Sequence, residues 1–128
     1  MSSLLKSVRI ILLADVDVAA ITTSISPKLK QDPTLPAVSY KQVSKPVDPL
    51  MDIGTPRVQI ESHADTYEEM EDLADAIRYC LQRYKGRVGG VRIEQITYLN
   101  EIDDEDPVTG RQSRIADYRV KYREATWH

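Results

Sequence analysis

Apolar residues recur with the period of an α-helix between residues 65 and 86, the most regular stretch of the chain. They form one stripe at helical spacing: Met70, Leu73, Ala74, Ile77, Leu81 and Tyr84. Thr66 and Glu69 have the spacing of a capping box, and Gly86 stands where a left-handed residue commonly ends a helix. We therefore predict a one-sided helix over residues 66–85 that covers an apolar surface formed by the rest of the chain.

Segments in which apolar and polar residues alternate predict four longer strands around this helix. Residues 38–44 and 57–64 precede the helix, and residues 91–99 and 111–123 follow it. In the last strand, one set of alternate side chains is expected to face the core: Ala116, Tyr118, Val120 and Tyr122. The intervening side chains are expected to face solvent: Asp117, Arg119, Lys121 and Arg123.

The strand over residues 91–99 has an irregular apolar pattern. Val91 and Ile93 share one parity, and Ile96 takes the other. Either a bulge lies near Gln95 or both faces of the strand are covered.

The N-terminal part of the chain is expected to hold two short helices. Residues 3–13 place apolar side chains on one helical face, and Asp15 can cap a second turn that ends at Ile21. Residues 22–26 predict a short strand, whereas the prolines of residues 28–36 predict irregular structure.

The apolar run at the N-terminus is too short to cross a bilayer, for which about 20 residues are needed. It extends from Leu4 to Leu13 and is followed by Asp15 and Asp17 without a small-residue cleavage site. We therefore interpret it as the N-terminal helix of a mature cytosolic protein that has no membrane partner.

The predicted order of the main elements is α, β, β, α, β, β. Strands joined by short connections favour antiparallel pairing. We expect an α+β fold, in which an antiparallel sheet has the main helix packed across one face and carries N-terminal helices. A single domain over residues 1–128 is expected, with a protruding connector at residues 45–55 and an acidic hairpin tip at residues 101–110.

The composition offers little material for catalysis. The chain has 128 residues, a net charge of −3, two histidines and one cysteine. The negative net charge argues against a general nucleic-acid binder, and no cluster has zinc spacing. His63 falls on the polar side of its strand and is expected to be a solvated or interface residue, whereas Cys80 is expected to be a buried thiol. We predict no enzyme activity, no cofactor and no metal.

The connector over residues 45–55 contains apolar residues in a segment rich in proline and glycine. Two interpretations remain open for these residues. They can fold back on the core, or they can form an arm that packs on a neighbouring molecule, because exposed apolar clusters often mark interfaces. The residues are Val47, Leu50, Met51 and Ile53.

An acidic run lies beside a basic strand. Residues 101–106 contain five carboxylates, among them Asp103, Asp104, Glu105 and Asp106, and the run is expected to be a solvated hairpin tip or an acidic contact surface. A calcium site fits poorly because the spacing is not that of an EF-hand loop. The following strand, within residues 111–124, is basic and carries Arg111, Arg114, Arg119, Lys121 and Arg123. The acids of one subunit can meet the bases of the next in a head-to-tail ring, or the two groups can neutralise each other within one subunit.

Motifs along most of the chain occur in a particular order: residues 15–21, 35–44, 57–61 with 66–78, and 86–93 with 117–124. This order resembles the tail-completion proteins of long-tailed bacteriophages and prophages, also called tail-to-head joining or tail-terminator proteins. The resemblance implies a structural virion protein that has no catalytic residues.

The resemblance also implies a set of partners and a location. The protein would form a ring with copies of itself, expected to be a hexamer, and would cap the tail tube protein and join it to the head connector protein. DNA would pass through the ring without specific recognition. The protein would lie at the head-proximal end of the tail in the virion and in the host cytoplasm during assembly. The alternative function is a small cytosolic ligand-binding or regulatory α+β module.

Overall fold

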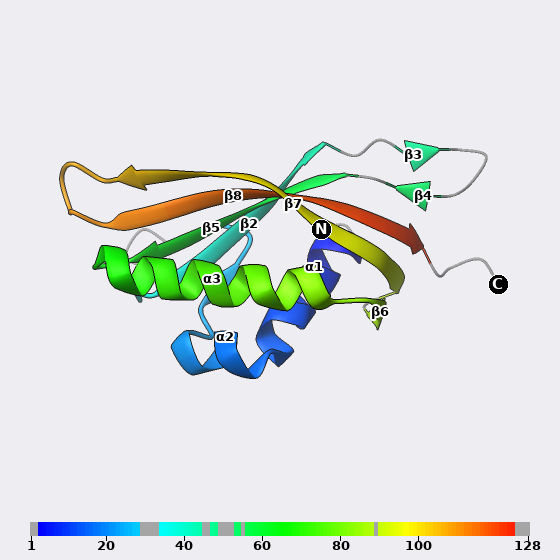
Figure 1. Ribbon diagram of the computed structural model, residues 1–128, viewed down its shortest axis with the longest axis horizontal. Coiled ribbons are helices and arrows are strands. Elements are labelled where there is room, and N and C mark those ends of the chain that lie inside the picture. Colours follow the sequence, from blue (N-terminus) through cyan, green and yellow to red (C-terminus); the bar gives the residue numbers. More distant parts are fainter. Residues whose placement is uncertain are drawn as a thin grey trace.

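Helices cover one face of a curved, mainly antiparallel sheet, and none of the helices that the structure describes lies on the other face (Figure 1). This arrangement is seen in a computed structural model that describes residues 3–28, 34–44, 47–48, 53–54, 56–88 and 90–124. Within these residues, the mixed α+β content agrees with the sequence prediction.

The main helix, α3, spans Tyr67–Arg83 and packs on the central strands. The hydroxyl oxygen of Thr66 accepts a hydrogen bond from the backbone N–H of Glu69 at 3.2 Å, which satisfies one of the free donors at the start of the helix. Five members of the predicted stripe are buried: Met70, Leu73, Ala74, Ile77 and Leu81. The sixth, Tyr84, is half-buried and lies just beyond the helix.

The C-terminal end of α3 differs from the prediction. The residue that caps the helix is Tyr84, which has an extended backbone with φ −77° and ψ 132°. Gly86 has φ +142° and lies at the start of a short strand. The prediction that Gly86 ends the helix is therefore wrong, because the helix ends at Arg83, two residues earlier than predicted, and Gly86 begins the strand that pairs with β7.

The N-terminal helices, α1 (Ser3–Ala14) and α2 (Val16–Ile21), agree with the prediction. The carboxylate of Asp15 accepts a hydrogen bond from the backbone N–H of Val18 at 3.0 Å and caps α2. One face of α1 enters the core with four side chains: Leu4, Val8, Ile11 and Leu12.

The long strands pair side by side in the order β2 (Ala37–Ser44), β5 (Arg57–Ala64), β8 (Gln112–Glu124) and β7 (Val91–Glu105), and each neighbouring pair is antiparallel. The buried apolar side chains of β8 are those predicted from the alternation: Ala116, Tyr118, Val120 and Tyr122. Arg114 is buried in addition.

Short strands extend this sheet. β1 (Ile25–Ser26) runs parallel to β2, and β6 (Gly86–Val88) pairs with the start of β7. β3 (Val47–Asp48) and β4 (Ile53–Gly54) pair with each other, and β4 also pairs with β8. The connector between β2 and β5 therefore holds short strands that the sequence did not predict, whereas its residues Leu50 and Met51 lie outside the described residues.

The irregular pattern of β7 comes from a bulge. The register with β8 shifts between Ile93 and Gln95, which confirms the first of the two alternatives, and it shifts again between Tyr98 and Asn100. The strand then continues to Glu105, and the turn of the hairpin is formed by residues 106–111. The prediction that the acidic run forms the hairpin tip is therefore wrong for residues 101–105, because these residues pair with β8.

Candidate functional site

The candidate interaction sites of this molecule are charged surfaces and a shallow groove. Within the described residues, no group of three or more histidine, cysteine or carboxylate side chains could hold a metal ion. No helix in the described ranges is long and apolar enough to cross a membrane.

A buried arginine on β8 contacts both the start of α3 and the C-terminal part of β7, at residues 101–103. Arg114 is 7% exposed. Its Nε lies 2.7 Å from Oδ1 of Asp103 and 3.0 Å from Oε2 of Glu101. Its Nη2 donates a hydrogen bond to the hydroxyl of Tyr67 at 3.1 Å. The guanidinium therefore ties the distal strand to the first turn of the helix.

Two further carboxylates approach the same guanidinium from α3. Oε2 of Glu71 lies 3.7 Å from Nη2 of Arg114, and Oδ1 of Asp75 lies 3.9 Å from Nη1 of Arg114. The hydrogen bond from Arg114 holds the pKa of Asp103 below its ordinary value. Four carboxylates therefore surround one cation, and this surface keeps an excess of negative charge.

The acidic residues predicted as contact points have different environments. Asp103 is engaged by Arg114. Asp106 accepts a hydrogen bond from the backbone N–H of Val108 at 2.9 Å and lies 3.8 Å from Arg111, and Glu105 accepts a hydrogen bond from Gln112 at 2.8 Å. Asp104 is exposed. Part of the acidic run is therefore neutralised within one subunit, in agreement with one of the alternatives left open by the sequence.

The basic residues predicted as contact points lie together on the opposite face of the sheet. Arg119, Lys121 and Arg123 are exposed, and they alternate with the side chains of β8 that are buried under the helices. In the register with neighbouring strands, Arg57 stands directly opposite Arg119, and Arg92 stands directly opposite Arg123. The structure thus separates acidic and basic surfaces onto two sides of the molecule.

His63 is buried, so the prediction of a solvated or interface histidine is wrong. It is 4% exposed, and its Nε2 lies 3.1 Å from the hydroxyl of Ser39 while its Nδ1 lies 2.8 Å from the hydroxyl of Ser113. Burial, with the nearby positive charge of Arg111, lowers the pKa of His63 to about 4. Both ring nitrogens of this neutral imidazole contact serine hydroxyls and not a carboxylate. The two hydrogen bonds link β2, β5 and β8.

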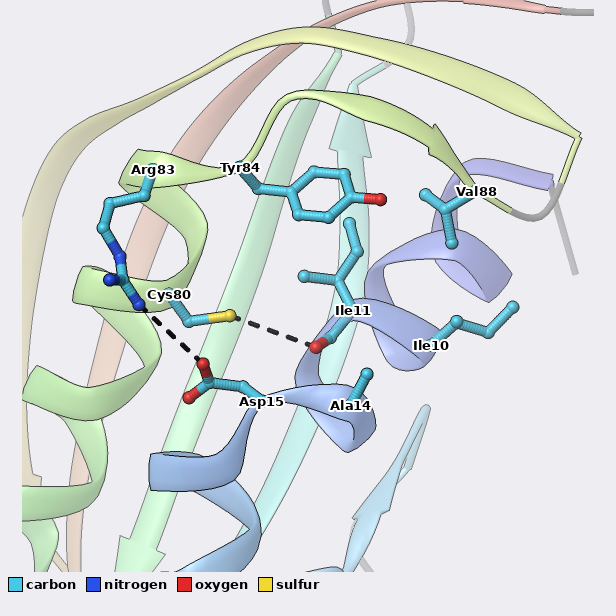
Figure 2. A pocket seen from close by; sticks show the side chains of 8 residues that line it. All are labelled: Ile10, Ile11, Ala14, Asp15, Cys80, Arg83, Tyr84 and Val88. Atoms are coloured by element: carbon cyan, nitrogen blue, oxygen red, sulfur yellow. Dashed lines mark hydrogen bonds and ion pairs between the residues drawn. The ribbon is translucent and has the colours of Figure 1, made fainter.

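A shallow groove of about 320 Å³ lies where α1, the start of α2, the end of α3 and β6 meet (Figure 2). Asp15 and Arg83 lie 3.9 Å apart at its rim. The thiol of Cys80 lies 4.0 Å from the carbonyl oxygen of Ile11, and burial raises the pKa of this thiol to about 12. The prediction of a buried thiol is confirmed, and the groove therefore holds a protonated thiol in an apolar wall.

Sequence reasoning missed the role of Arg114. It counted this residue only as part of a basic strand, although Arg114 has the same parity as the core residues Ala116 and Tyr118. An arginine at a core position of an alternating strand needs carboxylate partners, and this signal could have identified the residue. The serine partners of His63 could not be found in this way, because they depend on the pairing of three strands.

Comparisons with known proteins give two findings. A family model described as "Tail completion protein gp17" matches residues 6–123. A chain in the solved structure "Virion of native gene transfer agent (GTA) particle" is similar with a TM-score of 0.74 and 16% sequence identity, and the match covers 91% of this chain and 92% of that chain. At this identity the structural likeness shows a shared fold. No curated protein matches the chain.

Replacing Arg114 with leucine is expected to lower the free energy of unfolding by about 2 kcal/mol, because four carboxylates lose their shared cation. Urea denaturation at neutral pH measures this change. Lys6→Leu serves as the control, since Lys6 is exposed on α1, and its effect is expected to stay within about 0.5 kcal/mol. Equal effects of the two substitutions would contradict the role of Arg114.

The pKa of His63 predicts a loss of stability in acid. Its folded value of about 4 lies below the ordinary 6.5, so the unfolded chain binds more protons between these pH values. The free energy of unfolding should therefore decrease as the pH falls from 6.5 to 4, by at most about 3 kcal/mol from this residue. Denaturation curves of the wild type and of His63→Gln across this range measure the difference, and parallel pH profiles would show that His63 does not contribute.

Proposed function

The chain belongs to the family of tail completion protein gp17, and from this premise we propose that it caps the finished tail tube of a phage and joins the tube to the head connector. A structural role in a phage-type tail follows from membership of the family. The proposal adds a ring of identical subunits, expected to be a hexamer, and direct contacts with the tail tube protein and the head connector protein.

The observation that carries the proposal is the extent of the family match. It spans residues 6–123 and so includes the helices, the sheet and both charged surfaces. A family of structural virion proteins indicates a role without catalysis. The protein would then act by its shape and surface chemistry, at the head-proximal end of the tail, after assembly in the host cytoplasm.

A ring requires each subunit to present two different surfaces to its neighbours. The molecule offers charged surfaces of opposite sign on its two sides. The segment from β3 to β4 would add apolar contacts through Val47, Leu50, Met51 and Ile53, because β4 pairs with β8 and β3 extends the sheet beyond β4 at this edge. DNA would pass through the centre without specific contacts to bases.

The proposal predicts that the purified protein forms rings at high concentration or binds to the open ends of tail tubes that lack it. Negative-stain electron microscopy would show the rings and the capped ends, and light scattering would show the mass of the assembly. A chain that remains a monomer and never binds tubes or connectors would contradict the proposal. Stabilisation of such a monomer by a small molecule in a thermal-shift screen would favour a ligand-binding module instead.

The double substitution Leu50→Asp with Met51→Asp is expected to weaken assembly more than folding, because charged residues would replace apolar ones in a contact between subunits. Sedimentation velocity measures assembly, and circular dichroism measures folding. Val108→Asp is a suitable control, because Val108 is 89% exposed in the hairpin turn. Loss of the folded signal in the double variant would show that the two residues belong to the core.

A further inference from the structure

The uncovered face of the sheet carries a group of cations, which we call the basic sheet face. They come from four adjacent strands and lie at one end of the sheet: Arg57, Arg87, Arg92, Arg119, Lys121 and Arg123. All of them are exposed except Arg57, which is half-buried. The helices pack on the other side of the sheet, so nothing in the described part of the chain covers these side chains.

The basic sheet face contains like charges in direct opposition. Arg87 stands opposite Arg92, and Arg92 stands opposite Arg123, so that three arginines form one row across β6, β7 and β8. Arg57 and Arg119 form a second pair across β5 and β8. Like charges directly opposite each other on a sheet destabilise it by a few tenths of a kcal/mol or more per pair. The isolated subunit therefore carries a repulsion that an anionic partner would relieve.

Only part of this repulsion is relieved within the subunit. Glu94, the extra residue at the first bulge of β7, lies 3.1 Å from Arg123 and 4.0 Å from Lys121. Asp117 accepts a hydrogen bond from Gln59 at 3.2 Å. Among the described residues, no carboxylate forms an ion pair with the two remaining members of the arginine row or with the second pair.

The opposite side of the molecule carries the complementary charge, on what we call the acidic helix face. Its members come from α3 and from β7: Glu68, Glu71, Asp72, Asp75, Glu101 and Asp103. Asp75 is 70% exposed and Glu71 is 48% exposed, whereas Arg114 beneath them is 9% exposed at its side chain. The buried guanidinium holds the surrounding carboxylates in place, and most of their charge remains available at the surface.

We propose that the basic sheet face of one copy binds the acidic helix face of a second copy, which makes this contact the repeating step of the assembly. The inference rests on the proposed ring. One surface belongs to the sheet layer and the other to the helix layer (Figure 1), so two copies joined in this way still present one free basic surface and one free acidic surface between them. Contacts of this heterologous kind close into rings when the rotation between copies allows it. Complementary charge also favours correct orientation over like-charge encounters.

Two charge-reversal variants test the contact. Arg92→Glu with Arg119→Glu changes the basic sheet face and removes cross-strand repulsion, so its fold should be at least as stable as that of the wild type. Glu68→Lys with Asp72→Lys changes the acidic helix face at positions that leave the carboxylates next to Arg114 intact. Lys6→Glu, a reversal on α1 outside both surfaces, is the control.

Sedimentation velocity at low salt measures the protein concentration at which each variant assembles. Each reversal variant alone should need at least about tenfold more protein to assemble, whereas the control should behave as the wild type does. A mixture of equal amounts of the two variants should assemble at lower protein concentration than either variant alone. The unchanged acidic face of one variant meets the unchanged basic face of the other, and the two changed faces again bring opposite charges together. High salt should weaken assembly of the wild type.

Other outcomes would overturn the inference. Assembly of either variant at wild-type concentrations, or a mixture that remains monomeric, would exclude this contact. Binding of double-stranded DNA by the wild type that is lost in Arg92→Glu with Arg119→Glu, with assembly unchanged, would assign the basic sheet face to nucleic acid instead. Wild-type protein that binds tail tubes but never contacts a second copy would exclude the contact and leave the role in the tail standing.

Discussion

The pairing of β8 with its neighbours is the constraint on which the rest of the structure depends. β8 lies between β5 and β7 and also pairs with β4. Its register directs Tyr118 and Tyr122 under the helices and Arg119 and Lys121 to the open face. Because side chains alternate along a strand, a slip of one residue would exchange these two sets. The hydrophobic core and the separation of charge are therefore fixed by the same set of hydrogen bonds.

The sequence predicted the elements whose pattern is local. The helical stripe around Leu73 and Ile77 and the alternation of β8 gave α3 and the last strand almost at their observed bounds. The bulge near Gln95 was one of two alternatives, since a change of parity is visible in the sequence although its cause is not. Such features could be predicted because each depends on residues that are close together in the chain.

The features that the sequence did not predict depend on contacts between distant segments. His63 has the parity of a solvent-facing residue, yet it is buried between hydroxyls that come from β2 and β8. The acidic run at residues 101–105 has the composition of a loop, yet it forms a strand because Arg114 compensates part of its charge. Predicting these two features would have required the register of the sheet. Predicting that the acidic and basic surfaces lie on opposite sides of the molecule would have required the whole fold.

The thiol buried beside Ile11 has a consequence for the proposed ring of identical subunits. Disulfide exchange begins with a thiolate, and a thiol with a pKa of about 12 supplies almost none at neutral pH. Cys80 is the single cysteine of the chain. Subunits crowded together at high local concentration would therefore acquire no covalent cross-links through their own sulfur atoms, and misplaced copies would remain free to dissociate and bind again.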